Sequence, residues 1–418
     1  MSLDPTRLAS MANAIRALSM DAVQAANSGH PGMPMGMADV ATVLWSKYLK
    51  FDPSAPHWED RDRFVLSAGH GSMLIYALLH LSGYERPTMD DIRNFRQLGS
   101  PCAGHPENFL LDGVEATTGP LGQGLAMAVG MAIAERHLNA HFGDDLCDHQ
   151  TWVIAGDGCL MEGLNHEAIG FAGHLKLGRM IVLWDDNGIT IDGKADLSTS
   201  EDVKARYSAT GWHVESCNGH DFADIARAID AALADDRPSL IACKTIIGKG
   251  APNKQGTSAT HGAPLGGEEI AAARAELGWT AAPFEVPQDI GMNWLATADR
   301  GREAHLQWQE RIAAAGSRGE AFIARFGLVG DAAGKALEEY IRGLAREPKA
   351  VATRKASEMA LGPLTERIPQ LIGGSADLTG SNNTKTASTA PLTAQDYAGR
   401  YLYYGIREFG MAAAMNGM

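Results

Sequence analysis

The sequence predicts an α/β fold with a doubly wound, largely parallel sheet, followed by a helical linker and the start of a second α/β domain. From Arg61 to about Ile247, short β-rich runs alternate with helical stretches, which is typical of helices packed on both faces of a parallel sheet. From about Glu268 to Ala350 the composition shifts to Ala, Glu and Arg at helical spacing. We therefore expect a first domain at 1–320, a linker at 321–349 and an incomplete second domain at 350–418.

The N-terminal segment is expected to form an ordinary helix. Its apolar residues Leu8, Met11, Ile15, Leu18 and Ala22 recur at helical spacing. They do not form the continuous apolar core of a signal peptide. No apolar run in the chain approaches the roughly 18 residues of a membrane span.

The elements of the first domain follow from short apolar runs and the helical stretches between them. Phe, Val, Leu and Ile dominate the runs, as expected for strands buried on both faces. We expect strands at 64–66, 152–155, 180–183 and 240–246, and helices at 72–81, 124–138, 162–177 and 224–233. Residues 283–292 resemble a surface excursion.

The second unit is expected to begin with a helix at 351–367, a strand at 370–373 and a loop at 374–386. A further helical pattern starts at Glu408 and has barely begun when the sequence stops at Met418. About 70 residues are too few to close an α/β domain with helices on both faces of its sheet. We expect that the chain is truncated within its second domain.

The most informative residues follow two neighbouring strands. Asp157 comes directly after the run 152–155, and Asn187 follows the run 180–183, with one helix between them. This is one βαβ unit, so both side chains are expected at the carboxyl edge of the sheet, where ligands of such sheets bind. Carboxylate, amide and main-chain oxygens are ligands for Mg²⁺ or Ca²⁺. Glycines surround both positions, so we expect a metal-bound diphosphate here.

Composition and charge restrict the partners. With 45% hydrophobic and 21% charged residues the chain is that of a soluble globular protein. Its net charge of −14 argues against nucleic acid or an anionic membrane as main partner, but a local basic pocket could still bind a phosphorylated substrate. The five scattered cysteines indicate reduced thiols in the cytosol.

Four histidines lie in loops of small residues. His30, His70 and His105 each follow a glycine, and His261 precedes one. Such loops offer little packing surface, so their imidazoles could converge around a polyhydroxylated or phosphorylated ligand. His220, in Asn-Gly-His-Asp, is interpreted instead as part of a turn that opens the next helix.

Further candidates are weaker. The segment Gly119-Pro120-Leu121-Gly122-Gln123-Gly124 precedes a helix and suits either anion binding by main-chain N–H groups or close helix packing. Arg354 and Ser381 are candidate phosphate contacts in the second unit. Glu408 starts a helix, where a carboxylate is usually a first-turn acid, although in a dry pocket it could exchange a proton.

Eleven motifs follow one another along the chain: SGHPG at 28–32, AGHGS at 68–72, AGHPE at 103–107, GPLGQG at 119–124, GDGCLMEG at 156–163, DDNGITIDG at 185–193, IGKGAP at 247–252, HGAPLG at 261–266, ATRKAS at 352–357, GGSADLTGSN at 373–382 and REFGM at 407–411. With these motifs in this order, the sequence resembles transketolase, a thiamine-diphosphate enzyme family, over essentially its whole length.

The resemblance implies roles for individual residues. Those expected to ligate the metal, Mg²⁺ with Ca²⁺ or Mn²⁺ as substitutes, are Asp157, Asn187 and the main-chain oxygen of Ile189. Those expected around thiamine diphosphate are His70, Gly119, Pro120, Leu121, Gly158, Glu162, Asn187 and His261. Those expected to act on the reacting carbons or contact the sugar phosphate are His30, His105, His261, Arg354, Asp377 and Ser381. Glu408 would bond the aminopyrimidine ring of the cofactor and so let it remove its own C2 proton.

The resemblance also implies a thiamine-diphosphate-binding domain at 1–320, the start of a pyrimidine-binding domain at 350–418, and a cytoplasmic homodimer with sites at the subunit interface. The implied reaction transfers a two-carbon unit from xylulose 5-phosphate to ribose 5-phosphate or erythrose 4-phosphate, in the pentose phosphate pathway or the Calvin cycle. Alternatives are a related thiamine enzyme, such as dihydroxyacetone synthase, deoxyxylulose-phosphate synthase or phosphoketolase, and a non-catalytic Mg²⁺–nucleotide-binding regulator. A pure scaffold would leave the loop histidines without a purpose.

Overall fold

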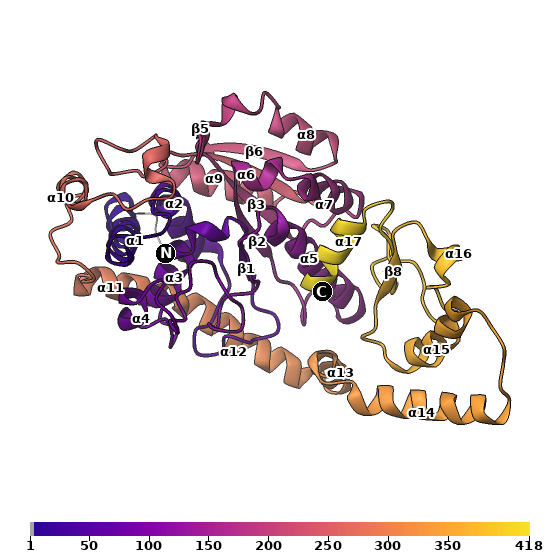
Figure 1. Cartoon of the computed structure of the whole chain (residues 1–418). Coiled ribbons are helices and arrows are strands. Elements are labelled where there is room, and N and C mark those ends of the chain that lie inside the picture. The colour runs from indigo at the N-terminus through magenta and orange to yellow at the C-terminus, as the bar shows by residue number, and fades with distance from the viewer. Residues whose placement is uncertain (1–3) are drawn as a thin grey trace.

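The computed structural model describes residues 4–418, and a five-stranded sheet lies at its centre (Figure 1). Its strands stand in the order β1-β2-β3-β7-β6, and every neighbouring pair is parallel. The first four are almost completely buried, as their apolar runs require. The bounds are β1 Arg63–Leu66, β2 Thr151–Gly156, β3 Met180–Asp186, β6 His213–Asn218 and β7 Ser239–Lys244.

Helices cover both faces of this sheet. On one face α5 (Gln123–Phe142) packs on β1 and β2 and against α7 (Gly163–His174). On the other face α2 (Gly32–Val43) packs on β3 and against α9 (Phe222–Leu233), which covers β6 and β7. The chain runs from β6 through α9 back to β7, the inner neighbour of β6 in the sheet. The expected doubly wound α/β fold is confirmed.

The expected strands and helices of the first domain form within a few residues of their predicted bounds, and the first helix is α1 (Pro5–Ala26). Strand β6 was not predicted. Its sequence His-Val-Glu-Ser-Cys-Asn is largely polar, because this strand lies at the edge of the sheet and only Cys217 is buried. The pattern of apolar residues in this segment is therefore too weak to indicate a strand.

The expected surface excursion at 283–292 is wrong in its second half. Helix α11 (Gln288–Leu295) forms there and buries Trp294, whose indole Nε1 donates a 3.0 Å hydrogen bond to the main-chain oxygen of Met11. The remaining elements of the first domain are α3 Met73–Ser82, α4 Met89–Arg93, α6 Asp157–Met161, β4 Ile189–Thr190, β5 Gly193–Lys194, α8 Val203–Ala209 and α10 Gly267–Glu276.

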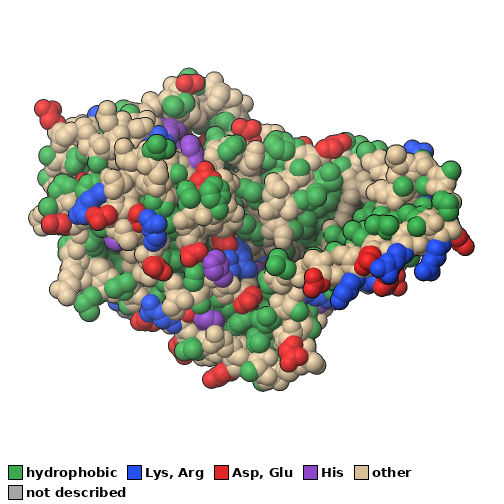
Figure 2. All heavy atoms as spheres, turned by 60° about the horizontal axis from the view of Figure 1, so that its bottom comes forward, with side chains coloured by type: hydrophobic (Ala, Val, Ile, Leu, Met, Phe, Trp, Pro, Cys, Tyr) green, Lys and Arg blue, Asp and Glu red, His purple; other side chains and the backbone are tan. Residues whose placement is uncertain are grey.

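A helical arm leads from the first domain to the second unit. It comprises α12 (Asp299–Ala314), α13 (Ser317–Ile323) and α14 (Gly330–Arg346), and α14 then packs against α15 (Thr353–Arg367). Figure 2 shows basic and acidic side chains interspersed along the protruding part of this arm. On α14, Arg342 forms an ion pair with Glu338.

The second unit in the chain is small. It holds α16 (Thr379–Asn382) and the two parallel strands β8 (Gly373–Ser375) and β9 (Tyr401–Tyr403). The strand predicted at 370–373 begins only at its last residue, because the N–H of Leu371 bonds to the oxygen of Ile368 and so bends the chain after α15.

The last helix, α17 (Glu408–Gly417), returns to the first domain and lies on α5 and α7 (Figure 1). The two helix backbones nearly touch. A Cβ on Gly130 of α5 would lie 1.9 Å from the oxygen of Ala414, and one on Gly417 would lie 1.9 Å from the oxygen of Met127. This close approach requires glycine at both points and fixes α17 along α5.

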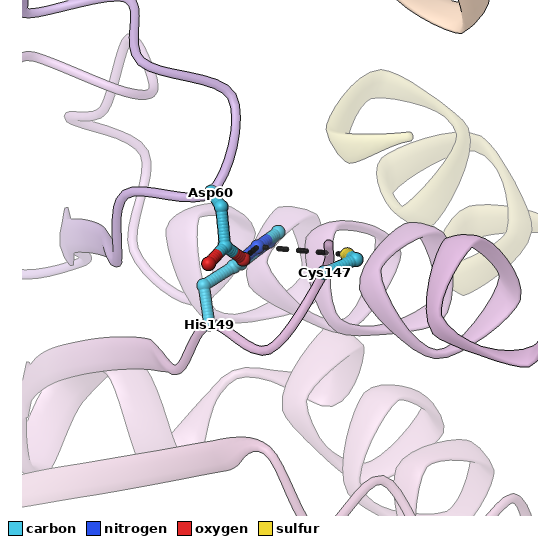
Figure 3. Close-up of side chains that lie close together, drawn as sticks. All are labelled: Asp60, Cys147 and His149. Carbon is cyan, nitrogen blue, oxygen red and sulfur yellow. Dashed lines mark hydrogen bonds and ion pairs between the residues drawn. The ribbon is translucent and has the colours of Figure 1, made fainter. Parts of the chain in front are cut away.

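Three potential metal ligands, Asp60, Cys147 and His149, gather in the interior before β1 and β2 (Figure 3). The Asp60 carboxylate already accepts hydrogen bonds from His149 Nδ1 at 3.2 Å, the N–H of Asp148 at 2.7 Å and Lys50 Nζ at 2.8 Å. A cation would have to displace these donors and approach the Lys50 ammonium. The arrangement is therefore better explained as a hydrogen-bonded clamp between the segments that enter β1 and β2.

Replacing Asp60 with Asn should lower the free energy of unfolding by about 3 kcal/mol, because it leaves Lys50 without its counter-charge in a buried site. Burial alone would raise the pKa of Asp60, but His149 and Lys50 outweigh it and hold this pKa below its ordinary value. The stabilisation is therefore present above a pH of about 4 and is lost as the pH falls through the lowered pKa. Urea unfolding between pH 3 and 7 measures both effects.

The matched control is Glu338→Gln, which removes a carboxylate from the exposed pair with Arg342 on α14. It should change the free energy of unfolding by less than about 0.5 kcal/mol. Equal losses of unfolding free energy in the two variants would show that the buried contacts of Asp60 stabilise the fold no more than an exposed ion pair does.

Candidate active site

A cavity of about 300 Å³ opens at the carboxyl edge of the sheet, above the ends of β2 and β3. Histidines, glycines, two carboxylates, an amide and a few apolar residues surround it. Its lining includes His30, Met33, Ala68, His70, Gly119, Leu121, Gly156, Asp157, Gly158, Asp185, Asn187, Ile189, Ile191, Ile247 and His261. Most of the residues predicted for the metal and the cofactor therefore share one cavity.

The two strand ends meet as the βαβ geometry predicts. Asp157 is the first residue after β2, and its Oδ2 accepts a 3.1 Å hydrogen bond from the main-chain N–H of Gly188, beyond β3. Its Oδ1 accepts a 2.9 Å bond from the indole of Trp184. The Asp157 carboxylate thus joins the tips of two neighbouring strands, next to Asn187 and Ile189.

Asn187 is held by a residue that the sequence did not single out. Its side-chain Nδ2 donates to Asp185 Oδ2 at 2.8 Å, while its Oδ1 accepts from the N–H of Ile189 at 2.8 Å. Asp185 is buried, and the Thr245 hydroxyl donates to its other oxygen. One signal in the sequence could have indicated this role. It is the presence of a carboxylate in a strand that is otherwise apolar and that helices cover on both faces.

Negative charge accumulates at this edge. Burial, followed by the neighbouring acidic groups, raises the pKa of Asp185 to about 7, and burial with the nearby Asp186 raises that of Asp157 to about 6. The only cation that the described residues pair with this group is Lys244, bonded to Asp186. Carboxylates crowded in this way repel one another, and a divalent cation bound among them would relieve the repulsion.

Three of the four predicted histidines form a cluster. The ring centroids of His30 and His70 lie 5.0 Å apart, those of His70 and His261 5.2 Å, and those of His30 and His261 5.8 Å. Burial lowers the pKa of His30 to about 4 and that of His70 to about 3, and it also lowers the pKa of His261. All three imidazoles are therefore neutral near pH 7.

The cluster has free hydrogen-bonding capacity. The Nδ1 atoms of His30 and His261 are buried and have no hydrogen-bond partner among residues 4–418. Unpartnered buried nitrogens in a cavity are expected to bond a ligand. His105 lies at the rim instead: it is exposed, and its ring is placed 3.2 Å from where a Cβ of Gly119 would be.

The glycine-rich segment contributes in two ways. Gly119 and Leu121 line the cavity, whereas Pro120 is exposed beside them. Gly122 adopts a left-handed φ of 81° at the start of α5, and Gly124 packs so closely on Ser67 that a Cβ would lie 2.7 Å from the Ser67 Cα. Close packing therefore accounts for Gly124.

The residues predicted in the second unit do not reach this cavity within one chain. Arg354, Asp377, Ser381 and Glu408 are all exposed and absent from its lining. Because α17 lies on the outer side of α5 and α7, Glu408 is not enclosed in a dry pocket here. Glu162 is likewise exposed, at the start of α7.

His220 does more than form the predicted turn. Its Nδ1 donates to Asp39 Oδ2 at 2.8 Å, and its Nε2 accepts from the N–H of Ile246 at 2.9 Å. Asp39 is in turn paired with Arg16 at 2.6 Å. His220 thereby ties the segment that follows β7, and that leads to Ile247 and His261, to helix α2. These are contacts between distant parts of the chain, which local sequence cannot reveal.

Comparison with known proteins agrees with this geometry. Residues 8–325 match the family model "Transketolase, thiamine diphosphate binding domain", and residues 349–418 match "Transketolase, pyrimidine binding domain". The chain belongs to the transketolase family. It spans about three fifths of the length of the curated relatives it matches, for example 62% of the transketolase of Cereibacter sphaeroides, to which it is 60% identical over 98% of its own length.

Solved transketolases share the fold. A structure from Leishmania mexicana is 44% identical, with a TM-score of 0.90 over 98% of this chain and 62% of the other. A Pichia stipitis transketolase in complex with sedoheptulose 7-phosphate is 40% identical, with a TM-score of 0.89 over the same shares. Among residues 4–418 no helix has the length and apolar character needed to cross a membrane.

Replacing His220 with Ala should speed amide hydrogen exchange at Ile246 by about tenfold, because one hydrogen bond of about 1.4 kcal/mol is lost. Exchange followed by mass spectrometry over 240–262 measures this. The matched control is His57→Ala, whose side chain is 80% exposed and pairs with Asp112. Unchanged exchange at Ile246 in the His220 variant would refute the anchoring role.

Proposed function

We propose that this chain carries the diphosphate- and metal-binding part of a transketolase, which transfers a two-carbon ketol unit from a ketose phosphate to an aldose phosphate. The supporting observation is the single cavity in which a carboxylate rim faces a cluster of neutral histidines. The rim suits a hard cation with its diphosphate, and neutral imidazoles suit sugar hydroxyls.

The residues present fit a metal-bound thiamine diphosphate. Asp157, Asn187 and the main-chain oxygen of Ile189 would hold Mg²⁺, for which Ca²⁺ or Mn²⁺ could substitute. Gly119, Leu121 and Gly158 line the cavity where the diphosphate would lie, and Gly158 must be a glycine there because a Cβ would lie 2.7 Å from the Leu121 side chain. His70 and His261 would border the cofactor. When bound, the cofactor supplies the electron sink for breaking and forming the carbon–carbon bond beside a ketose carbonyl.

The protein's own part is positioning and proton transfer. His30, with His261 beside it, offers a nitrogen that can accept a proton from a sugar hydroxyl and return it, because both rings are neutral near pH 7. His105 at the rim would hold the sugar near its reacting carbons. Relatives solved with sedoheptulose 7-phosphate and with xylulose 5-phosphate support sugar phosphates as substrates.

We further propose a cytoplasmic homodimer. Within one chain Glu408 and the candidate phosphate contacts Arg354, Asp377 and Ser381 lie away from the cavity, so a second copy would have to bring them to it. Exposed apolar side chains on this side, such as Ile406 at 78% and Phe409 at 52%, would then be covered. Glu408 would there hold a proton at the aminopyrimidine ring.

Transfer from xylulose 5-phosphate to ribose 5-phosphate by the full-length polypeptide tests the reaction. Dependence on formaldehyde or pyruvate instead would favour dihydroxyacetone synthase or deoxyxylulose-phosphate synthase, and phosphate-dependent cleavage would favour phosphoketolase. Tighter binding of a nucleotide than of thiamine diphosphate would favour a regulator.

Asp157→Ala should weaken Mg²⁺-dependent binding of thiamine diphosphate by on the order of 100-fold or more, because it removes a metal ligand and the bridge between the strand tips. Titration calorimetry with and without Mg²⁺ measures this loss. Asp192→Ala, on the exposed tip between β4 and β5, is the control and should leave the affinity unchanged. Unchanged affinity in the Asp157 variant would reject the metal site.

Glu408→Gln in the full-length dimer should preserve most of the cofactor affinity but slow deuterium exchange at C2 of thiamine diphosphate by about 100-fold, because the amide cannot hold the required proton. Proton NMR after acid quench follows the exchange. Glu347→Gln, on the linker, is the control and should exchange at the parent rate. Equally fast exchange in the Glu408 variant would remove Glu408 from the mechanism.

A further inference from the structure

Arg96 joins two of the histidine loops. Its Nη1 donates a 2.8 Å hydrogen bond to the hydroxyl of Ser28, two residues before His30. The guanidinium also lies on Gly104, the residue before His105: a Cβ built there would be 3.0 Å from the Arg96 Nε and 3.1 Å from its Cζ. The Arg96 side chain therefore contacts residues that are close in sequence to both His30 and His105.

The conformation of Arg96 is held by its surroundings. Its φ of 62° is left-handed, which a residue with a side chain adopts at a cost, and its main-chain N–H bonds to the oxygen of Cys102 at 2.9 Å. Its neighbour Phe95 is buried, with ring carbon Cε1 2.9 Å from where a Cβ of Gly29 would lie. The residue is thus built into the site and is not a freely moving surface arginine.

The charge of Arg96 has no acidic partner, and its guanidinium Cζ lies 5.7 Å from the centroid of the Phe95 ring. No carboxylate in residues 4–418 lies within ion-pair distance of it, and its Nε is buried without a hydrogen-bond partner. After burial itself, Arg96 is the main cause that lowers the pKa of both His30 and His105. The other groups facing His30 are His261, His105 and His70, and Glu107 acts on His105 in the opposite direction.

We propose that Arg96 is a positioning residue of this site, which locks the loops of His30 and His105 together and places an unpaired positive charge beside both imidazoles. A positive charge disfavours a second one nearby, so both rings stay neutral and able to accept a proton from a bound hydroxyl. Arg96 thus couples the rigidity of the two loops to the proton affinity of their histidines, which burial lowers in the first place. The assignment deepens the proposed function, but the state of the two histidines can be measured without any substrate.

The test separates the charge of Arg96 from its hydrogen bond. Arg96→Gln removes the charge and keeps a donor for Ser28, Arg96→Lys keeps the charge, and Ser28→Ala removes the bond alone. Imidazole titration by ¹³C–¹H NMR on the cofactor-free chain should show the pKa of His30 and of His105 rising by about half a pH unit or more in Arg96→Gln. In Arg96→Lys and Ser28→Ala the pKa of each histidine should stay within about 0.2 pH unit of its value in the parent protein. The positive charge is kept in both variants, and solvent and salt screen the effect of a small displacement of it.

His57, which is exposed and pairs with Asp112, is the internal reference and should be unaffected by the substitutions. If Arg96→Gln does not fold, Arg96→Met serves as the second charge-free variant. The proposal is overturned if His30 and His105 keep the same pKa values in the charge-free variant as in the parent. It is also overturned if the reference signal of His57 changes by as much as theirs.

A second readout uses the assembled full-length enzyme. In Arg96→Gln the acidic limb of kcat/KM should move to higher pH by the same amount as the histidine titration, and Arg96→Lys should restore the parent profile. A histidine shift without any transfer from xylulose 5-phosphate would leave the Arg96 assignment standing and reject the proposed function. A loss of rate with an unmoved pH profile would reject the assignment.

Discussion

The site depends on one carboxylate that holds two strand tips together. Parallel strands bring β2 and β3 to a common edge, but alignment alone does not fix the loops beyond them. Asp157 does so by accepting from the N–H of Gly188, and Asp185 then orients the Asn187 amide. Without these bonds the oxygens at the two tips would point to separate places, and no common cation could bridge them.

The ionisable side chains around this edge are of two kinds, acidic groups at the strand ends and neutral histidines. The ends of β2 and β3 concentrate carboxylates whose ionisation burial opposes, which supports the proposed cation site. In the same cavity, burial keeps His30 and His70 neutral. Acidic groups on one side and neutral imidazoles on the other support the proposed binding of a metal-bound diphosphate and the proposed exchange of protons. The overall charge of −14 is no obstacle, because these local arrangements decide what binds.

The sequence predicted the first domain well, because buried parallel strands have continuous apolar runs and the loop between each strand and helix has little freedom. It predicted the shared edge at Asp157 and Asn187 for the same reason. It did not predict β6, whose edge position allows polar residues, or the long-range bonds of His220 and Asp185, which depend on contacts between segments distant in the chain. Arg354, Asp377, Ser381 and Glu408 stay predictions, because one copy of the chain does not bring them to the cavity.

The contact between α5 and α17 has a mechanical consequence. Where backbone meets backbone at Gly130 and Gly417, there is no layer of flexible side chains to absorb sliding or rotation. The position of α17 on the first domain is therefore set by main-chain contact, in addition to the covalent connection through α12 to α14. The helix that begins at Glu408 is thereby held against α5, which itself packs on β1 and β2.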